Sequence, residues 1–531
     1  MRINHLFLFF LSLILLLMHS SCRKETTKNY IVIGSTIDID SFNPYLSTSL
    51  FSQDLLDRLY LRLAIEQEDY RTFIPLLAKR WEWSKDSTQI TFYLRNDVYW
   101  TDGVKTTAYD VEFSFKAATS PEVAWLNAED IVRNIESVKA INETILTVKY
   151  RYVYPYQLTD INDIWIVPKH VYEKIPFSEW RRNGFFDENP VTNGPYKVAR
   201  WERGQLIELV KNERYFDKAY PKIGRIFIKI VPNESNLLLQ FLNGEIDVLP
   251  SIPPAVAEKY ENNPDIKFIK YPFLAYEYIG WNQKNPIFAD KRVRQALSYG
   301  INVDEIIKVI LKGNAVRSTS PFPSIFWAHN EKLKPYPYNP EKAKKLLAEA
   351  GWKDSNGDGI LDKIIDNRKV DFKFTLITNA ENQTRKEVAT AIQNDLLKLG
   401  IKMEIQIFEF NTFMRHILNK NFDAVLSGWR VATKPDLATV FHTEAIKSGH
   451  NIVSYSNPQF DKLNDSAAVL NNLSNAKVIW DKVQEIIYED QPYTFLYEPV
   501  RINGISKRIK PETVRMNSIS FLYNLHEWEL K

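Results

Sequence analysis

Short apolar strand segments alternate with amphipathic helix segments along much of the chain, and this alternation restricts the fold more than any other feature. A helix that begins at Asn233 is followed by a strand over residues 246–249. Likewise, a helix over residues 388–399 is followed by a strand over residues 402–407. Helices and strands in such succession bury their apolar faces against one another in layers. The pattern therefore predicts an α/β protein in which helices flank a mixed sheet.

The size and composition of the chain set the next limits. Its 531 residues are too many for one hydrophobic core, so several domains are expected. The hydrophobic fraction of 45% and the charged fraction of 25% are typical of a globular protein. The net charge is only +3 and no long basic run occurs, so the chain lacks the electrostatic signature of nucleic-acid binding. No nucleic-acid partner is expected.

The N-terminus carries an apolar run over residues 6–18, which follows Arg2. Thirteen residues are too few to span a bilayer as a helix, but they suit the core of a signal peptide. Two serines and Cys22, the single cysteine of the chain, come next. This order resembles a bacterial lipoprotein signal, although His19 stands where a leucine-like residue is usual.

We therefore expect residues 1–21 to be a signal peptide and residues 22–29 a polar tether. Acylation of Cys22 through several chains would hold the mature protein stably on a membrane. The working part of the chain would then be extracytoplasmic and lipid-anchored, on the periplasmic side or at the cell surface. A plain secreted protein with an unmodified cysteine is the alternative.

Catalytic signatures are missing from the sequence. It contains no His-Glu-x-x-His, Gly-x-Ser-x-Gly or Gly-x-Gly-x-x-Gly motif, and its eight histidines are scattered singly. A Ser-x-x-Lys match at residues 474–477 lacks the accompanying motifs of penicillin-binding enzymes and is attributed to chance. We expect neither catalysis nor a cofactor. A secreted, lipid-anchored hydrolase remains the alternative of a different class.

One loop resembles the first half of an EF-hand calcium loop. It offers oxygen ligands at loop positions 1, 3, 5 and 9, but position 12, normally a bidentate glutamate, is Ile365. Asx-turns in a tight surface loop explain the same residues without an ion. No metal is expected, and weak calcium binding is the alternative. The four candidate ligands are Asp354, Asn356, Asp358 and Asp362.

Residues 421–441 are the strongest local candidate for a pocket wall. An apolar run over residues 422–426 leads to Trp429 and then to a loop that carries Arg430 and Lys434. A buried strand that delivers an aromatic ring and charges into a loop is a common way to line a pocket. An ordinary surface turn explains the same residues, and the local sequence does not separate the two interpretations.

Several motifs occur in a characteristic order between residues 41 and 458. They are SFNP at 41–44, TFYLRNDVYWTDG at 91–103 with AYDV at 108–111, GPYK at 194–197, RVRQA at 292–296, YNP at 338–340 and YSNP at 455–458. From about residue 31 to the C-terminus, this series resembles the extracytoplasmic solute-binding proteins that serve peptide and nickel ABC transporters, bacterial solute-binding protein family 5.

The resemblance implies a bilobal α/β fold of the periplasmic-binding-protein type (type II) with an extra inserted domain. The ligand lies between the lobes, and closure around it is a hinge motion. The expected units are a discontinuous lobe I (residues 30–56, 186–275 and 494–531), an inserted domain II (57–185) and a lobe III (276–493).

The resemblance also implies a function. We expect the substrate-binding component of an ABC transporter, which captures an oligopeptide-like solute and delivers it to membrane permease subunits. A monomer is expected. Main-chain hydrogen bonds to an extended peptide would tolerate varied side chains. The alternatives on the same fold are binding of a nickel chelate, an oligosaccharide or a cell-wall peptide.

The resemblance breaks at one position of interest. Peptide-binding members carry an aspartate after the Gly-Trp pair that binds the α-amino group of the ligand, and the matching residue here is Ala432. Either Asp436 or another acid replaces this anchor, or the ligand has no free amine. Arg430 and Lys434 can receive a carboxylate or another anion instead. The predicted ligand-binding residues are Trp429, Arg430, Asp436, Thr36, Asp38 and Asn282.

Overall fold

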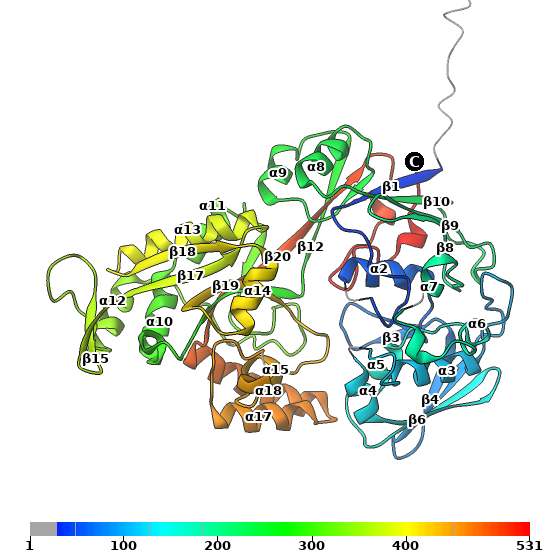
Figure 1. Ribbon diagram of the computed structural model, residues 1–531, viewed down its shortest axis with the longest axis horizontal. Coiled ribbons are helices and arrows are strands. Elements are labelled where there is room, and N and C mark those ends of the chain that lie inside the picture. The colour runs from blue at the N-terminus through cyan, green and yellow to red at the C-terminus, as the bar shows by residue number, and fades with distance from the viewer. Residues whose placement is uncertain (1–28, 48, 126, 183, 449) are drawn as a thin grey trace, which may run out of the picture.

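The computed structural model describes residues 29–531 except residues 48, 126, 183 and 449. The predicted signal peptide, Cys22 and all of the predicted tether except Asn29 lie outside the described residues. Within them, one sheet of 12 strands runs through two lobes, with the order β18-β17-β19-β13-β20-β11-β1-β10-β9-β8 and with β12 and β14 also paired to β20 (Figure 1). The predicted bilobal α/β architecture is confirmed.

Lobe I and domain II form the half of the molecule on the right of Figure 1. The elements of lobe I before β20 are β1 (Tyr30–Ser35), α2 (Leu50–Leu59), β8 (Tyr196–Glu202), β9 (Leu206–Lys211), β10 (Arg225–Ile230), α8 (Glu234–Leu242), β11 (Val248–Leu249), α9 (Pro254–Lys259) and β12 (Ile266–Pro272). Those of domain II are β2 (Ala64–Glu66), β3 (Phe73–Pro75), β4 (Ala78–Trp83), β5 (Gln89–Leu94), α3 (Ala108–Ala118), α4 (Ala128–Asn134), β6 (Ile135–Asn142), β7 (Ile145–Tyr150), α5 (Gln157–Asn162), α6 (Lys169–Tyr172), η1 (Phe177–Glu179) and α7 (Phe185–Glu188).

Lobe III forms the other half. Its elements are β13 (Ala275–Trp281), η2 (Pro286–Phe288), α10 (Lys291–Gly300), α11 (Val303–Val309), β14 (Ala315–Arg317), α12 (Pro340–Glu349), β15 (Asp362–Ile365), β16 (Arg368–Asp371), β17 (Lys373–Asn379), α13 (Gln383–Leu397), β18 (Lys402–Phe408), α14 (Phe410–Leu418), β19 (Ala424–Arg430), α15 (Ala438–Phe441), α16 (Ala445–Ser448), α17 (Pro458–Ala468) and α18 (Leu473–Asp490). Strand β20 (Tyr493–Ser506) follows, and the chain continues through η3 (Pro511–Thr513) and η4 (Leu525–Glu527).

Strand β20 belongs to both lobes. Its first half pairs with β13 and β14 of lobe III, and its second half pairs with β12 and β11 of lobe I. Pro499 stands within this strand. The proline is accommodated in the ladder opposite Ala315, and its carbonyl accepts a hydrogen bond from Phe273 N at 3.1 Å. With the short link from β12 to β13, β20 is a covalent connection between the lobes.

The buried residues join domain II to lobe I. One continuous core includes Ile33 of β1, Phe92 of β5 and Val148 of β7, so the two units share a hydrophobic interior. Lobe III instead has a core on each face of its sheet. Successive strand residues point to opposite faces, so Val425 enters one of these cores and Leu426 the other. The exact domain boundaries stay predictions.

Local signals for helix ends act as the sequence predicts. The side chain of Asn302 accepts a hydrogen bond from Glu305 N and caps α11, and Asn339 caps α12 in the same way through Lys342 N. Gly351 adopts a φ of +89°, the left-handed conformation that suits a residue just after a helix. None of the described helices is both long and apolar enough to cross a membrane.

Candidate functional site

Two adjoining cavities lie where lobe III faces lobe I and domain II. We call the first, of about 270 Å³, the acidic cavity, because its lining has four acids and three arginines: Asp54, Asp57, Glu66 and Asp163 with Arg58, Arg62 and Arg430. We call the second, of about 400 Å³, the arginine cavity, because Arg430 and Arg501 line it. Both are bounded by α2, by the end of β19 and by the C-terminal loop around Ser518. The residues common to both linings are Leu50, Asp54, Arg430, Ser518, Ile519 and Ser520.

Helix α2 turns its charged side toward this space. Ser49 caps the helix by accepting a hydrogen bond from Ser52 N at 3.1 Å. Leu55, Leu56 and Leu59 are buried in the core, so the opposite side of the helix presents Asp54 and Asp57 to the acidic cavity. A single amphipathic helix thus supports the core of lobe I and supplies polar groups to the cleft.

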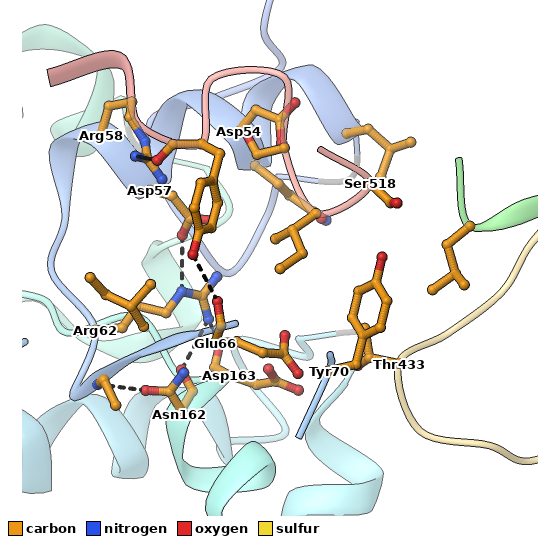
Figure 2. Close-up of a pocket in the computed structure, with 18 of the residues that line it drawn as sticks. Asp54, Asp57, Arg58, Arg62, Glu66, Tyr70, Asn162, Asp163, Thr433 and Ser518 are labelled. Atoms are coloured by element: carbon orange, nitrogen blue, oxygen red, sulfur yellow. Dashed lines mark hydrogen bonds and ion pairs between the residues drawn. The ribbon is translucent and has the colours of Figure 1, made fainter. Parts of the chain in front are cut away.

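The position of Arg62 in the acidic cavity is fixed by several partners. Its Nε lies 2.9 Å from Asp57 Oδ1, and its Nη1 donates to the carbonyls of Asn162 and Asp163 at 3.1 and 2.7 Å (Figure 2). Its guanidinium carbon also lies 3.9 Å from the centre of the Trp165 ring, a cation–π contact. Arg62 and Asp57 therefore satisfy each other and hold the cavity wall together.

Glu66 and Asp163 differ from Asp57, because neither is paired with Arg62 through its side chain. Figure 2 shows their carboxylates side by side and directed into the cavity. Glu66 Oε1 is buried and has no hydrogen-bond partner among the described residues. Burial and the neighbouring charge of Asp163 raise the pKa of Glu66 to about 7. Burial also raises the pKa of Asp163, although Lys434 and Arg62 oppose this. A cation between the two carboxylates would stabilise their charged forms.

Asp54 lies at the junction of the two cavities. Burial raises its pKa to about 7, against the lowering effect of a hydrogen bond from Ser520 and of the Arg430 charge. In the arginine cavity, Arg501 Nη1 donates to Ser251 Oγ at 2.6 Å, and its guanidinium carbon lies 4.0 Å from the centre of the Phe273 ring. Burial lowers the pKa of Arg501. An anion would offset the cost of burying this guanidinium.

Two of the six predicted ligand-binding residues line a cavity. Thr36 follows β1 and lines the arginine cavity. Arg430 is the last residue of β19 and lines both, and its Nη2 lies 3.5 Å from the carbonyl oxygen of Ile519 across the cleft. Ala432 is exposed in the loop after β19, between Val431 and Thr433, which both line the acidic cavity. The position of the missing aspartate therefore lies between two residues of the cavity wall but outside the lining itself.

The other four predicted residues have partners within the fold and lie outside both linings. Trp429 is partly buried in a lobe III core, 6.4 Å from the His450 ring. Asp38 accepts hydrogen bonds from Trp201 Nε1 and Gly204 N at 3.1 and 2.7 Å. The hydrogen bonds of Asp38 explain that residue structurally, whereas Trp429 Nε1 is buried without a hydrogen-bond partner among the described residues. Their roles in ligand binding stay predictions.

The side chains of Asn282 and Asp436 form hydrogen bonds at the end of a strand and at the start of a helix, respectively. Asn282 is buried and donates through Nδ2 to the carbonyl of Phe422 at 2.7 Å, which ties the end of β13 to the start of β19. Asp436 Oδ1 accepts from Ala438 N at 2.8 Å and from Asn464 Nδ2 at 3.3 Å, and so supports the start of α15.

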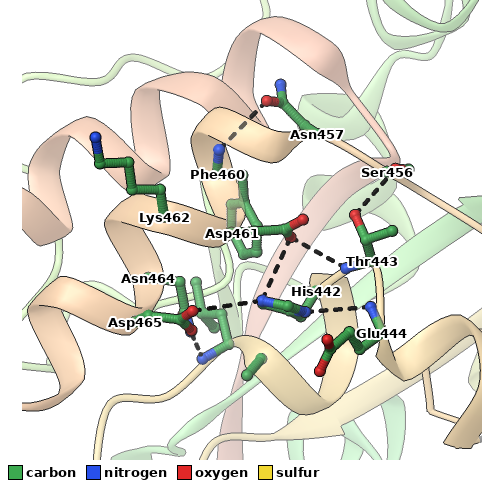
Figure 3. A network of polar contacts seen from close by, with 12 residues as sticks. His442, Thr443, Glu444, Ser456, Asn457, Phe460, Asp461, Lys462, Asn464 and Asp465 are labelled. Atoms are coloured by element: carbon green, nitrogen blue, oxygen red, sulfur yellow. Dashed lines mark hydrogen bonds and ion pairs between the residues drawn. The ribbon is translucent and has the colours of Figure 1, made fainter.

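Beyond α15, polar contacts fasten this segment to α17 (Figure 3). His442 Nε2 lies 3.6 Å from Asp465 Oδ2 and 3.9 Å from Asp461 Oδ1, and Asp461 also accepts a hydrogen bond from Thr443 N at 3.0 Å. These contacts hold the outer end of the 430–441 loop, so that the loop residues beside the cleft are anchored at both ends.

The calcium-like loop is closed by its own hydrogen bonds. Asp354 accepts from Gly357 N and Gly359 N at 2.7 and 2.9 Å. Asp362 accepts from Ser355 and lies 3.2 Å from Lys369 Nζ, and these partners lower its pKa. Among the described residues, no group of three or more acidic, histidine or cysteine side chains is placed to hold a metal ion.

The principal acids of the cavity were not singled out in the sequence. Asp54 and Asp57 lie in α2, Arg62 follows that helix, and Glu66 ends the short strand β2. The available signal was the concentration of opposite charges within an otherwise apolar stretch. Only the packing of domain II brings Asp163, about a hundred residues later in the chain, beside Glu66.

Comparison with known proteins identifies the class. Residues 72–451 match the bacterial extracellular solute-binding proteins, family 5. The chain is 32% identical to the oligopeptide-binding protein AppA of Bacillus subtilis over 524 residues, which cover 96% of this chain and 94% of that protein. It is 26% identical over 520 residues to the dipeptide-binding protein of Escherichia coli, with coverages of 92% and 93%.

Solved structures give the same result. AppA of Bacillus subtilis in complex with a nonapeptide has a TM-score of 0.76 at 30% identity, with 94% of this chain and 99% of that chain covered. NikZ of Campylobacter jejuni in complex with Ni(L-His) has a TM-score of 0.78 at 27% identity, with the same coverages. The fold and the cleft thus define a type II binding protein. The chain belongs to the family 5 bacterial extracellular solute-binding proteins.

Proposed function

We propose that this protein is the substrate-binding component of an ABC importer and captures peptide-like solutes between its lobes. The observation that carries the proposal is the pair of adjoining cavities, whose walls come from both lobes and from domain II and carry opposite charges. A free peptide has an ammonium group at one end and a carboxylate at the other, so such a cleft complements it. The peptides named for AppA and the E. coli relative support the same ligand class.

In this arrangement, ligand binding favours hinge closure. Arg430, Val431 and Thr433 approach the cleft from lobe III, whereas Asp54 and Glu66 approach it from the other half. A ligand that contacts both sides binds the closed form more tightly than the open one, and so shifts the population toward closure. The closed, loaded protein is the form presented to the permease subunits. We place the mature protein outside the cytoplasm, as a monomer anchored through a lipid at Cys22.

The test is ligand screening by thermal shift. The chain from residue 23 onward, which retains every described residue, is mixed with di- to pentapeptides, oligosaccharides, cell-wall peptides and nickel–histidine. We expect short peptides to raise the Tm. Stabilisation by nickel–histidine alone would favour the chelate function, for which the likeness to NikZ is the motivating observation. If no compound stabilises the protein, the transport function is wrong, and turnover of a compound would show an enzyme.

Trp429 provides a second test, at residue level. We retain the proposal that its ring forms part of the wall met by a bound ligand. A Trp429→Ala variant should then bind the peptide found in the screen more weakly than the wild type does. If the variant binds the peptide as tightly as the wild type does, Trp429 only packs within lobe III and does not contact the ligand. Arg430→Gln serves as the comparison, because Arg430 lines both cavities and should weaken binding in either case.

A further inference from the structure

The acidic cavity contains a carboxylate that the fold leaves unsatisfied. Asp57 is neutralised by Arg62 at 2.9 Å, and Asp163 lies 3.8 Å from Lys434 Nζ. Glu66 Oε1 is different, because it is shielded from solvent and has no hydrogen-bond partner among the described residues. Burying a carboxylate without partners is costly. Because the unsatisfied Glu66 carboxylate lies at the wall of a cavity, a bound ligand can supply the missing partner.

Glu66 lies at the same cavity as the lobe III loop that lacks the anchoring aspartate. Val431 and Thr433, which flank Ala432, line the same cavity as Glu66 and Asp163. The methyl group of Ala432 cannot accept a hydrogen bond, but the carboxylates of domain II face the same space from the other wall (Figure 2). Domain II therefore offers two acids to this cavity, although Ala432 of lobe III offers none.

We propose that Glu66, with Asp163 beside it, binds the α-ammonium group of a peptide ligand from the domain II side of the cleft. This inference rests on the proposed function and specifies the orientation of the ligand. The amino terminus lies in the acidic cavity, and the chain runs past Asp54 toward the arginine cavity, where Arg430 and Arg501 receive the carboxylate. Glu66 supplies an acceptor for an N–H of the ammonium group through Oε1, and Asp163 supplies a second charge.

The local electrostatics agree with this assignment. Burial and Asp163 raise the pKa of Glu66 to about 7, so the empty site holds this carboxyl partly protonated near neutral pH. An ammonium group favours the ionised form of both acids, so binding is accompanied by proton release. The groups that face Glu66 from neighbouring elements are Asp163 and Asp69, which raise its pKa, and Arg62 and Lys434, which lower it.

The experiment compares free and blocked amino termini. The probe is a random tetrapeptide mixture made without lysine, arginine or histidine, so that the α-amine is its only cation, and the same mixture after N-acetylation. We expect the free mixture to raise the Tm of the wild type by more than the acetylated one. In Glu66→Gln this difference should fall by at least half. Glu68→Gln is the matched control and should keep it, because Glu68 is exposed, lies outside both linings and bonds to Asn517.

The outcomes separate the two proposals. If neither mixture stabilises the wild type, the peptide-binding function is wrong and the assignment of Glu66 fails with it. If both mixtures stabilise the wild type equally, or if Glu66→Gln keeps the difference, peptide binding stands and the assignment alone is overturned. Asp163→Asn provides a second variant, for which we expect a smaller loss of the difference, because Asp163 contributes charge beside the acceptor.

Discussion

Lys434 of lobe III forms an ion pair with Asp160 of domain II, and the side chain of Asp160 is completely buried. Asp160 also accepts hydrogen bonds from Asn134 Nδ2 at 2.8 Å and from the hydroxyl of Tyr154. The pair bridges the cleft, since it joins the loop after β19 to α5 on the opposite side. Closure thus brings a lysine to a carboxylate that the rest of domain II already holds in place.

Lys434→Ala should favour the open form. Removing one partner of a buried pair leaves a charge that needs solvent, and rotation about the hinge provides solvent at less cost than unfolding. We expect the equilibrium to move toward the open form by roughly 1–3 kcal/mol, visible as a larger radius of gyration in small-angle X-ray scattering. Lys477→Ala is the control, because its partner Asp481 lies in the same helix. Equal radii for Lys434→Ala and the wild type would contradict this role.

Gly428→Ala should destabilise lobe III. A Cβ at this position would collide with the Glu277 carboxylate and lie 2.7 Å from Arg385 Nη2. These two side chains form a bidentate ion pair at 2.7 and 2.8 Å and are only about one-seventh exposed, so they cannot move aside freely. We expect a loss of about 1–3 kcal/mol in unfolding free energy, as for overpacking of a core, measured by urea denaturation. Gly184→Ala, whose nearest neighbour lies at 3.9 Å, should be nearly neutral.

Glu66→Gln should stabilise the empty protein at high pH. The folded state raises the pKa of Glu66 from 4.5 to about 7, so it binds more protons than the unfolded state between these values. Stability therefore falls as the pH rises through this window, and above it the full cost of the buried charge is present. The variant should gain about 1–2 kcal/mol at pH 8 and nothing at pH 4.5, with partial exposure reducing the effect. Denaturation curves at both pH values, without peptide, measure it; an equal gain at both would refute the linkage.

Calcium should have no effect on stability. The carboxylates of the 354–362 loop already accept hydrogen bonds from its backbone, and Lys369 lies beside Asp362. Binding an ion would require these contacts to be exchanged, without the glutamate that normally completes such a site. We expect Tm values that agree within about 1 °C in 1 mM calcium and in EDTA, because a site with a weaker than millimolar Kd contributes little at that concentration. A clear rise with calcium would establish the weak site.

Prediction from the sequence succeeded where neighbouring residues decide the structure. The caps at Asn302 and Asn339 and the left-handed Gly351 follow from short-range chemistry. The order of several motifs predicted the family, and membership of the family implied the bilobal arrangement. At the end of β19 and in the loop after it, Arg430, Val431 and Thr433 line the acidic cavity. Their roles in ligand binding stay predictions.

The site itself was harder to predict, for a physical reason. Glu66 and Asp163 are distant in sequence, and nothing near either one indicates that burial will bring them together. Asp38 and Asn282 have side chains of the kind that bind ligands, and here they bond to backbone groups outside both linings, so their ligand-binding roles stay predictions. A polar side chain has the same appearance in a sequence whether it bonds to its own backbone or faces a cavity. Only the tertiary packing distinguishes the two.

The strand shared by the two lobes also affects how the protein is made. Lobe III needs the first half of β20 to complete its sheet, and lobe I needs the second half. A growing chain therefore cannot finish either lobe until Ser506 has left the ribosome, however early β1 or β13 is synthesised. Both lobes need β20, which is synthesised late, so the chain stays incompletely folded for almost the whole of its synthesis.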